Sequence, residues 1–180
     1  MYDVIIIGAG VSGCAIAREL ARLELKTLVL EKASDLCEGT SKANSGIVHG
    51  GFDAKPGTLK AKLNVEGSRE MEALSKELDF PYRQNGSLVL CFDEKDKDRL
   101  EKLKKSGQSN GVEGLKVLDR QTLRSLEPMV GEKAVAALYA PSGAIVCPFG
   151  LTIALAENAA ENGVEFHFQR EVKAIRREND

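Results

Sequence analysis

Val4-Ile5-Ile6-Ile7-Gly8-Ala9-Gly10-Val11-Ser12-Gly13 joins an apolar run to three glycines in the spacing G-x-G-x-x-G. The run predicts a β-strand that is buried, and the residues from the glycines through Leu23 have the apolar spacing of an amphipathic helix. A second apolar run, Thr27–Leu30, predicts another strand and ends in Glu31. The glycine motif alone would be weak evidence. A strand before it, a helix after it and an acid about 20 residues later together predict a dinucleotide-binding βαβ unit.

Each part of this unit has its own physical role. Gly8 permits the tight turn after the strand, Gly10 lets the backbone approach a pyrophosphate, and Gly13 lets the helix pack closely on the strand. The helix N-terminus offers N–H groups and the positive end of its dipole to the phosphates. The Glu31 carboxylate would accept hydrogen bonds from a ribose 2′-OH and would repel a 2′-phosphate, which disfavours NADP.

The composition is that of a soluble globular protein. Of the 180 residues 43% are hydrophobic and 29% charged, and the net charge of −2 has mixed signs, so nothing indicates a nucleic-acid or anionic membrane partner. The apolar runs are too short for a membrane span, and we expect neither a membrane span nor a secretory signal. Four scattered cysteines without a C-x-x-C pair, together with two histidines, predict reduced thiols in the cytoplasm and no metal site.

The order of the remaining elements predicts an interrupted domain. A helix over 148–162 and a strand over 164–168 return the chain to the first sheet, and residues 171–176 begin a further strand. Between them, helical spacing over 57–78 and 93–105, a short helix over 119–126, and strands over 80–83, 87–92, 115–118 and 134–139 predict a mixed α+β insertion. The predicted fold class is therefore α/β, a Rossmann-like domain of residues 1–51 and 148–180 interrupted by part of a substrate or cap domain, residues 52–147. The interruption favours FAD over NAD, because an NAD domain would continue directly into further βα units.

A second motif lies in the long loop after Glu31. Its residues Thr40-Ser41-Lys42-Ala43-Asn44-Ser45-Gly46-Ile47-Val48-His49-Gly50-Gly51 combine hydroxyls, an amide, a cation and closely spaced glycines. Such a segment can lay backbone N–H groups along a pyrophosphate or a flavin edge. A surface loop rich in serine and glycine is the alternative interpretation.

With both motifs in view, the sequence resembles the FAD-dependent oxidoreductases grouped with D-amino-acid oxidase. Thr40-Ser41 followed by Ile47-Val48-His49-Gly50-Gly51 resembles the glycerol-3-phosphate dehydrogenase branch, and Lys55-Pro56-Gly57-Thr58-Leu59-Lys60-Ala61-Lys62-Leu63 is similar to L-2-hydroxyglutarate oxidases. The specific motifs lie within residues 3–63. The resemblance implies FAD as cofactor and hydride transfer to the flavin from a C–H bond next to an alcohol or amine.

The resemblance also implies site residues. Gly8, Gly10, Val11, Ser12 and Gly13 would hold the pyrophosphate together with Thr40 and Ser41, while Glu31 would bind the adenosine ribose, with Lys32 and the Val172 backbone beside the adenine. Asn44, Ser45 and Gly46 would run beneath the isoalloxazine, and His49 would lie near the flavin and the substrate.

Three residues keep two interpretations each. A neutral imidazole at His49 could accept the substrate's hydroxyl proton, or it could orient the flavin or satisfy a buried hydrogen bond. Arg83 and Gln84 could face a substrate carboxylate or phosphate, or they could form a solvated turn.

Members of this group run to about twice this length, beyond one domain. We therefore expect an N-terminal fragment of an enzyme acting on glycerol 3-phosphate or a small 2-hydroxy acid, inactive by itself. The expected partners are a small anionic substrate and an electron acceptor, for which a partner redox subunit is one candidate. The alternatives are an amine or amino-acid oxidase of the same fold, a non-catalytic FAD-binding module and an NAD-dependent dehydrogenase.

Overall fold

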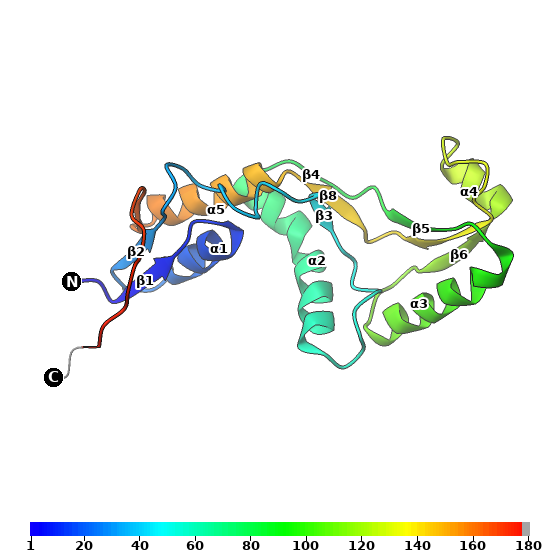
Figure 1. The fold of residues 1–180 in the computed structure, drawn as a ribbon, viewed down its shortest axis with the longest axis horizontal. Helices are drawn as coiled ribbons and strands as arrows, with labels where there is room; N and C mark the ends of the chain where they lie inside the picture. Colours follow the sequence, from blue (N-terminus) through cyan, green and yellow to red (C-terminus); the bar gives the residue numbers. More distant parts are fainter. Residues whose placement is uncertain (178–180) are drawn as a thin grey trace. The chain divides into compact units, whose positions relative to one another are not determined.

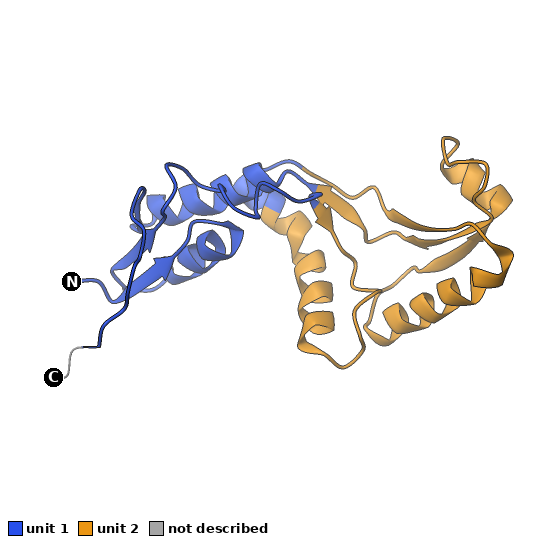
Figure 2. Ribbon diagram, in the orientation of Figure 1, with its two compact units in different colours: residues 1–46, 75–81, 146–180 blue, residues 47–74, 82–145 orange. Residues whose placement is uncertain are grey.

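The computed structural model describes residues 1–177, and the chain divides into two compact units (Figure 2). Unit 1 comprises Met1–Gly46, Ser75–Pro81 and Val146–Asp180, and unit 2 comprises Ile47–Leu74 and Tyr82–Ile145. These bounds differ from the expected segments at three places. Residues 47–51 belong to unit 2, where Ile47 and Val48 pair with another strand; Ser75–Pro81 folds with unit 1, because the last turn of a long helix packs there; and Val146 and Cys147 belong to unit 1.

Unit 1 is built on a three-stranded parallel sheet in the order β1-β2-β9 (Figure 1). The strands are β1 (Val4–Ile7), β2 (Thr27–Leu30) and β9 (Glu165–His167). α1 (Val11–Leu20) lies against β1 and β2, and α5 (Pro148–Glu161) packs on α1. The expected βαβ unit and the return of the chain to its sheet are therefore confirmed.

The first strand is buried on one face only. Ile6 is 9% exposed, whereas Ile5 and Ile7 are 53% and 57% exposed. Side chains alternate across a strand, so the four apolar residues of β1 serve two different faces. The prediction of a buried strand is therefore right for the face toward α1 and wrong for the other.

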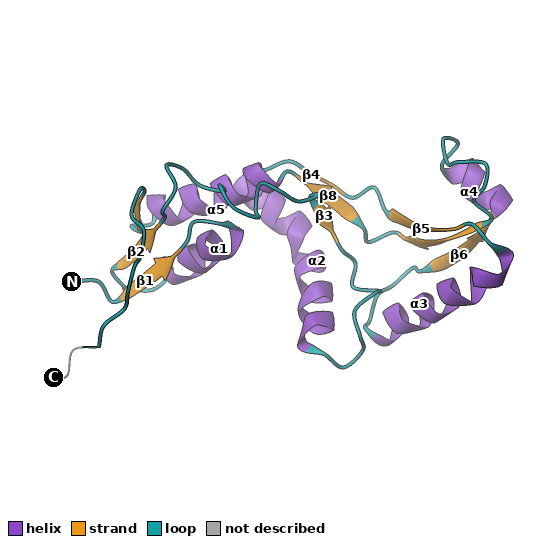
Figure 3. Cartoon of the chain, in the orientation of Figure 1, coloured by secondary structure: helices purple, strands orange, loops and turns teal. Residues whose placement is uncertain are grey.

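Unit 2 contains two antiparallel arrangements of strands (Figure 3). One sheet has the order β5-β7-β6, formed by Ser87–Cys91, Ala136–Ala140 and Lys116–Asp119; the other has the order β3-β8-β4, formed by Ile47–Val48, Ala144–Val146 and Tyr82–Arg83. The helical elements are α2 (Leu59–Leu78), which ends in unit 1, η1 (Glu94–Asp96), α3 (Lys97–Ser109) and α4 (Arg120–Leu126). The core gathers Leu138 of β7 with Leu100 of α3, Val65 of α2 and Phe52.

Several element bounds differ from the sequence prediction. α1 ends at Leu20, before the predicted Leu23, and Leu23 is 57% exposed, so this leucine does not belong to the buried stripe of the helix. The strands on either side of the Gln84–Gly86 turn join different sheets. Residues 171–176 form no strand, although their chain crosses beside the first sheet. No helix within residues 1–177 is both long and apolar enough to span a membrane.

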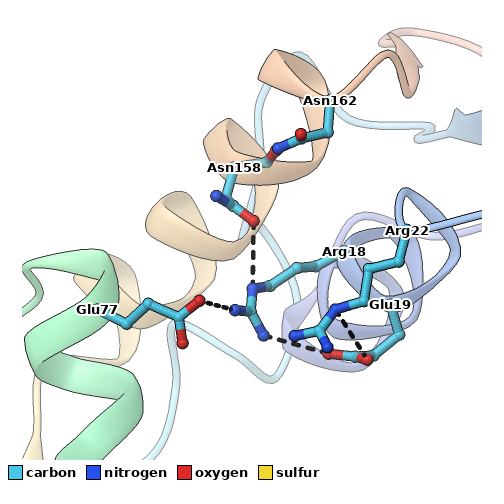
Figure 4. Close-up of polar contacts among 6 residues, drawn as sticks. All are labelled: Arg18, Glu19, Arg22, Glu77, Asn158 and Asn162. Atoms are coloured by element: carbon cyan, nitrogen blue, oxygen red, sulfur yellow. Dashed lines mark hydrogen bonds and ion pairs between the residues drawn. The ribbon is translucent and has the colours of Figure 1, made fainter.

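A buried arginine of unit 1 forms hydrogen bonds to α5 and to the last turn of α2 (Figure 4). Arg18 of α1 is 8% exposed, and its guanidinium donates to Asn158 of α5, to Glu77 of α2 and to its neighbour Glu19. A planar guanidinium can serve three acceptors in different directions, whereas an ammonium group concentrates its donors at one point. Arg18 thus fixes the last turn of α2 and the middle of α5 on the helix that follows the glycine motif.

We expect Arg18→Lys to lower the free energy of unfolding by about 2 kcal/mol, because at least one charged hydrogen bond is lost from a buried position. In a protein of this size the melting temperature would fall by about 5 °C. Arg22→Lys is the matched control, since the Arg22 side chain is exposed and forms its ion pair with Glu19. Equal melting temperatures for the two variants would contradict a bracing role for Arg18.

Candidate functional site

Gly8 and Gly13 of the motif occupy positions that require glycine, as predicted, and Gly10 lies close to Ser41. Gly8 has φ +102°, a conformation that L side chains rarely adopt, and its N–H donates to the Leu30 carbonyl at 2.8 Å. A Cβ on Gly13 would lie 2.0 Å from the Gly8 carbonyl oxygen, so α1 can approach β1 only with glycine here. A Cβ on Gly10 would lie 3.0 Å from the Ser41 Oγ. Glycine at each position keeps the N-terminus of α1 close to strand and loop.

Glu31 follows β2 and holds the glycine turn in place. Its Oε2 accepts from the Ala9 N–H and its Oε1 from the Ala33 N–H, both at 2.8 Å. Burial alone would raise the pKa of Glu31, but hydrogen bonds from the backbone N–H groups of Ala33, Ala9 and Lys32 outweigh it and lower the pKa below its usual value. The sequence predicts a ribose-binding acid here, and it contains no local signal for the bond to Ala9, 22 residues away.

This pKa shift predicts a pH-dependent stability. A carboxylate whose pKa is lower in the folded than in the unfolded state stabilises the fold above its unfolded pKa, and this contribution is lost as the pH falls through the folded pKa. We therefore expect the native protein to be more stable than Glu31→Gln near neutral pH, with the difference disappearing in acid. Urea unfolding of both proteins from about pH 7 to about pH 3 measures it. Glu24→Gln, on an exposed turn, is the control, and a Glu31 difference that persists unchanged at the acid end would contradict the prediction.

The segment after β9 lies beside the end of β2. The Glu31 N–H donates to the His167 carbonyl, the Arg170 N–H to the Glu31 carbonyl, and the Gln169 N–H to the Ala33 carbonyl. Gln169–Ile175 then lines a cavity of about 710 Å³ together with Ile5, Ile7 and Leu30. Val172 thus lies at the same end of the sheet as Glu31. Lys32, which follows Glu31 in the sequence, is exposed.

The loop after β2 returns to the N-terminus of α1. The Ser41 Oγ accepts from the Val11 N–H at 2.9 Å, which is the first amide of the helix. The Cys37 N–H donates to the Ala9 carbonyl at 3.1 Å, so a second point of the loop is fixed on the glycine turn. The structure therefore brings together two segments that the sequence singled out separately. The predicted residues Ser12, Thr40, Asn44 and Ser45 are all exposed.

Gly46 ends this part of the loop in a demanding conformation. Its φ is +64°, and a Cβ would lie 2.4 Å from the Val146 carbonyl oxygen. The Val146 N–H donates to the Gly46 carbonyl at 2.8 Å, so the two backbones are in direct contact. Only glycine satisfies both the backbone angle and the close approach.

We expect Gly46→Ala to destabilise the protein by about 3 kcal/mol, the sum of a left-handed backbone penalty and a backbone clash. Gly57→Ala separates the two effects, because Gly57 has φ +78° but nothing within 4 Å of its Cβ position. The free energy of unfolding of Gly57→Ala should fall by about 1 kcal/mol. Chemical unfolding measures both, and a Gly57 loss as large as that of Gly46 would show that contact with Val146 contributes nothing.

His49 belongs to unit 2, where it directly follows β3. Its side chain is exposed, whereas Gly50 and Gly51 after it are buried. Of the other candidates in this unit, Gln84 donates to the Pro141 carbonyl at 3.0 Å, which favours a structural role, and Arg83 is exposed in β4.

Cys14 is fully buried in α1, and its thiol donates to the Ala9 carbonyl at 3.6 Å. Burial above all, with the nearby Cys37 and Glu31, raises the pKa of Cys14 to about 11. A thiol that stays protonated at neutral pH is a poor nucleophile. Cys14 is therefore a packing residue.

The residues of unit 1 fit a bound dinucleotide. Gly10 leaves the approach to α1 free of a side chain, and the first turn of α1 carries amides that the helix itself leaves without partners. No acidic residue lies in that first turn, so no carboxylate competes there for a phosphate. Glu31, at the end of β2, accepts from the Ala9 N–H of the glycine turn, and the cavity lies beside the end of β2.

Comparison with known proteins identifies this arrangement. The family model described as FAD dependent oxidoreductase matches residues 3–180. Glycerol 3-phosphate dehydrogenase of Caloramator mitchellensis is 46% identical over 99% of this chain and 37% of its own length. A mitochondrial L-2-hydroxyglutarate dehydrogenase of Dictyostelium discoideum is 36% identical over 81% of the chain and 33% of its own length.

Among solved structures, L-alpha-glycerophosphate oxidase from Mycoplasma pneumoniae with FAD bound has a TM-score of 0.89 and 34% identity, covering 96% of this chain and 46% of that one. The chain thus spans less than half the length of these relatives. The family match covers nearly every residue, and the fold and the glycine turn agree with it. The chain belongs to the family of FAD-dependent oxidoreductases.

Proposed function

We propose that the protein is an FAD-dependent dehydrogenase or oxidase that oxidises glycerol 3-phosphate or a small 2-hydroxy acid. The observation that carries this proposal is the 46% identity to a glycerol 3-phosphate dehydrogenase over 99% of the chain. The 36% identity to an L-2-hydroxyglutarate dehydrogenase keeps the 2-hydroxy acids in the proposal. Glycerol 3-phosphate and the 2-hydroxy acids each carry a hydroxyl group close to an anionic group, a phosphate in the first and a carboxylate in the second.

The proposed division of labour follows the two compact units. Unit 1 binds FAD, with Glu31 on the adenosine ribose, the Val172 backbone and Lys32 beside the adenine, and the first turn of α1 with Thr40 and Ser41 on the pyrophosphate. Asn44, Ser45 and Gly46 belong to the flavin end of the same site. Unit 2 is part of the substrate domain and contributes His49.

Bound FAD supplies the hydride acceptor. The protein's own part is to hold the cofactor by backbone N–H groups and to remove the hydroxyl proton as the hydride leaves the carbon. His49 is the proposed general base, since a neutral imidazole can accept that proton. The substrate is a small anion, and the electron acceptor is a partner redox subunit or a small molecule. The four free cysteines support a reducing compartment, and we propose the cytoplasm.

The test is the spectrum of the purified full-length protein. It should be yellow, and anaerobic addition of the true substrate should bleach it. A panel of glycerol 3-phosphate, short L-2-hydroxy acids, glycine and other amino acids distinguishes this proposal from an amine oxidase of the same fold. A colourless protein that takes up no FAD would overturn the proposal, and bleaching by amines alone would replace it with the alternative.

A further inference from the structure

The side-chain amide of Asn44 forms hydrogen bonds to the backbone of its own loop. The Nδ2 donates to the Ser41 carbonyl at 2.8 Å and to the Thr40 carbonyl at 3.2 Å, and the Oδ1 accepts from the Gly46 N–H at 2.8 Å. Both amide hydrogens are therefore engaged, and the oxygen has one acceptor position left. One side chain closes the turn from Thr40 to Gly46.

The closed turn presents a hydroxyl to α1. The residue held by the shortest bond from the Asn44 Nδ2 is Ser41, whose Oγ accepts from the Val11 N–H at 2.9 Å. Gly10, the residue before α1, has no side chain to cap the helix, so the Ser41 hydroxyl supplies the acceptor that a capping residue normally provides. The hydroxyl also lies 3.0 Å from where a Gly10 Cβ would be.

We infer that Asn44 is a positioning residue for the pyrophosphate end of the cofactor site and acts through Ser41. This inference rests on the proposed FAD site and changes the role of Asn44 within it, from a residue beneath the isoalloxazine to a brace of the loop that delivers Ser41 to α1. The Ser41 Oγ accepts from the Val11 N–H, and the hydroxyl hydrogen of Ser41 can be donated to a pyrophosphate oxygen.

Two ligands separate this role from direct contact with the flavin. ADP contains the adenosine and the pyrophosphate of FAD but no isoalloxazine. We expect Asn44→Ala to weaken the binding of FAD and of ADP by the same factor, about tenfold, which is the usual effect of losing one well-placed hydrogen-bond partner. Calorimetric titration of the native and variant apoproteins measures both affinities. An ADP affinity that stays unchanged while that of FAD falls, or no change in either, would overturn the inference.

A double-mutant cycle gives an independent readout. If Asn44 acts through Ser41, the Ser41→Ala/Asn44→Ala double variant should bind FAD and ADP no more weakly than Ser41→Ala. The Ser41 hydroxyl that Asn44 positions is already absent from the single variant, so the loss of Asn44 has no further effect. Losses that multiply would place Asn44 in separate contact with the cofactor and refute the inference. Lys42→Gln, an exposed residue of the same turn, is the matched control and should bind both ligands like the native protein.

Misfolding is distinguished by a measurement of stability. Melting curves of Asn44→Ala should show a folded protein at the temperature of the titrations, so that the equal loss for the two ligands is a loss of binding and not of the fold. If the native protein binds neither FAD nor ADP, the proposed function fails. If the native protein binds both and the Asn44 variants bind ADP normally, this inference alone fails.

Discussion

Gly13→Ala should abolish stable FAD binding, with a loss in affinity of at least about 100-fold, equivalent to about 3 kcal/mol. The added methyl group would lie 2.0 Å from the Gly8 carbonyl oxygen and 3.4 Å from the Ile6 Cγ2. The obstacle is backbone, so no side-chain rotation relieves it, and α1 must move away from β1. Such overpacking costs about 3 kcal/mol or more. The amides at the start of α1 move with the helix, so stability and cofactor affinity should fall together.

Gly67→Ala is the control for this prediction. Gly67 also lies in a helix, but nothing is found within 4 Å of its Cβ position. Alanine there should stabilise the protein by about 0.5–1 kcal/mol, because glycine is a poor helix former. Melting curves and FAD titration of both variants decide the matter. A Gly13→Ala protein that melts and binds FAD like the native one would show that the close packing of α1 on β1 is unnecessary.

The dinucleotide unit is the part of the fold that sequence reasoning predicts best. Its signal is local: the apolar runs, Gly8 through Gly13 and Glu31 lie within about 30 residues, and each has one physical reason to be there. The same holds for α5, where Pro148 begins the helix and Gly163, with φ +93°, follows its end. In such segments, local preference and tertiary structure agree.

Contacts between distant segments escape the same reasoning. Ile47 and Val48 form a strand only because Ile145 and Ala144 lie opposite them, almost 100 residues later in the chain. Their two-residue pattern has no strand signal of its own. The bond from the Val11 N–H to Ser41 and that from Ala9 to Glu31 likewise depend on how the chain returns, and serine or glutamate in a loop does not specify its partner. The absence of a strand at 171–176 has the same origin, since a strand requires a partner edge and not merely apolar residues.

His49 illustrates what the structure adds to a candidate known from sequence. Before it, Val48 is paired with Ala144. After it, a Cβ on Gly50 would lie 2.5 Å from the Ser142 Oγ, and a Cβ on Gly51, whose φ is +88°, would lie 2.6 Å from the Val65 Cγ2. The backbone on both sides is therefore packed closely against other segments of unit 2, while the imidazole itself is exposed. A closely packed backbone with an accessible side chain suits a general base, because the position of such a base must be fixed before the substrate arrives.

We accordingly expect His49→Asn to lower kcat of the full-length enzyme by about 10²–10⁴, the usual contribution of a positioned acid or base. The FAD content and the melting temperature should stay unchanged, because the imidazole is exposed and Asn retains a similar polar reach. His167→Asn is the matched control, since His167 is the other histidine of the chain and its backbone carbonyl, not its ring, accepts the Glu31 N–H. Steady-state rates with the best substrate of the panel, together with flavin absorbance, measure the outcome. A His49→Asn enzyme that loses FAD but keeps its rate per bound flavin would assign His49 to orienting the cofactor, and the proton would then have to be taken by another residue.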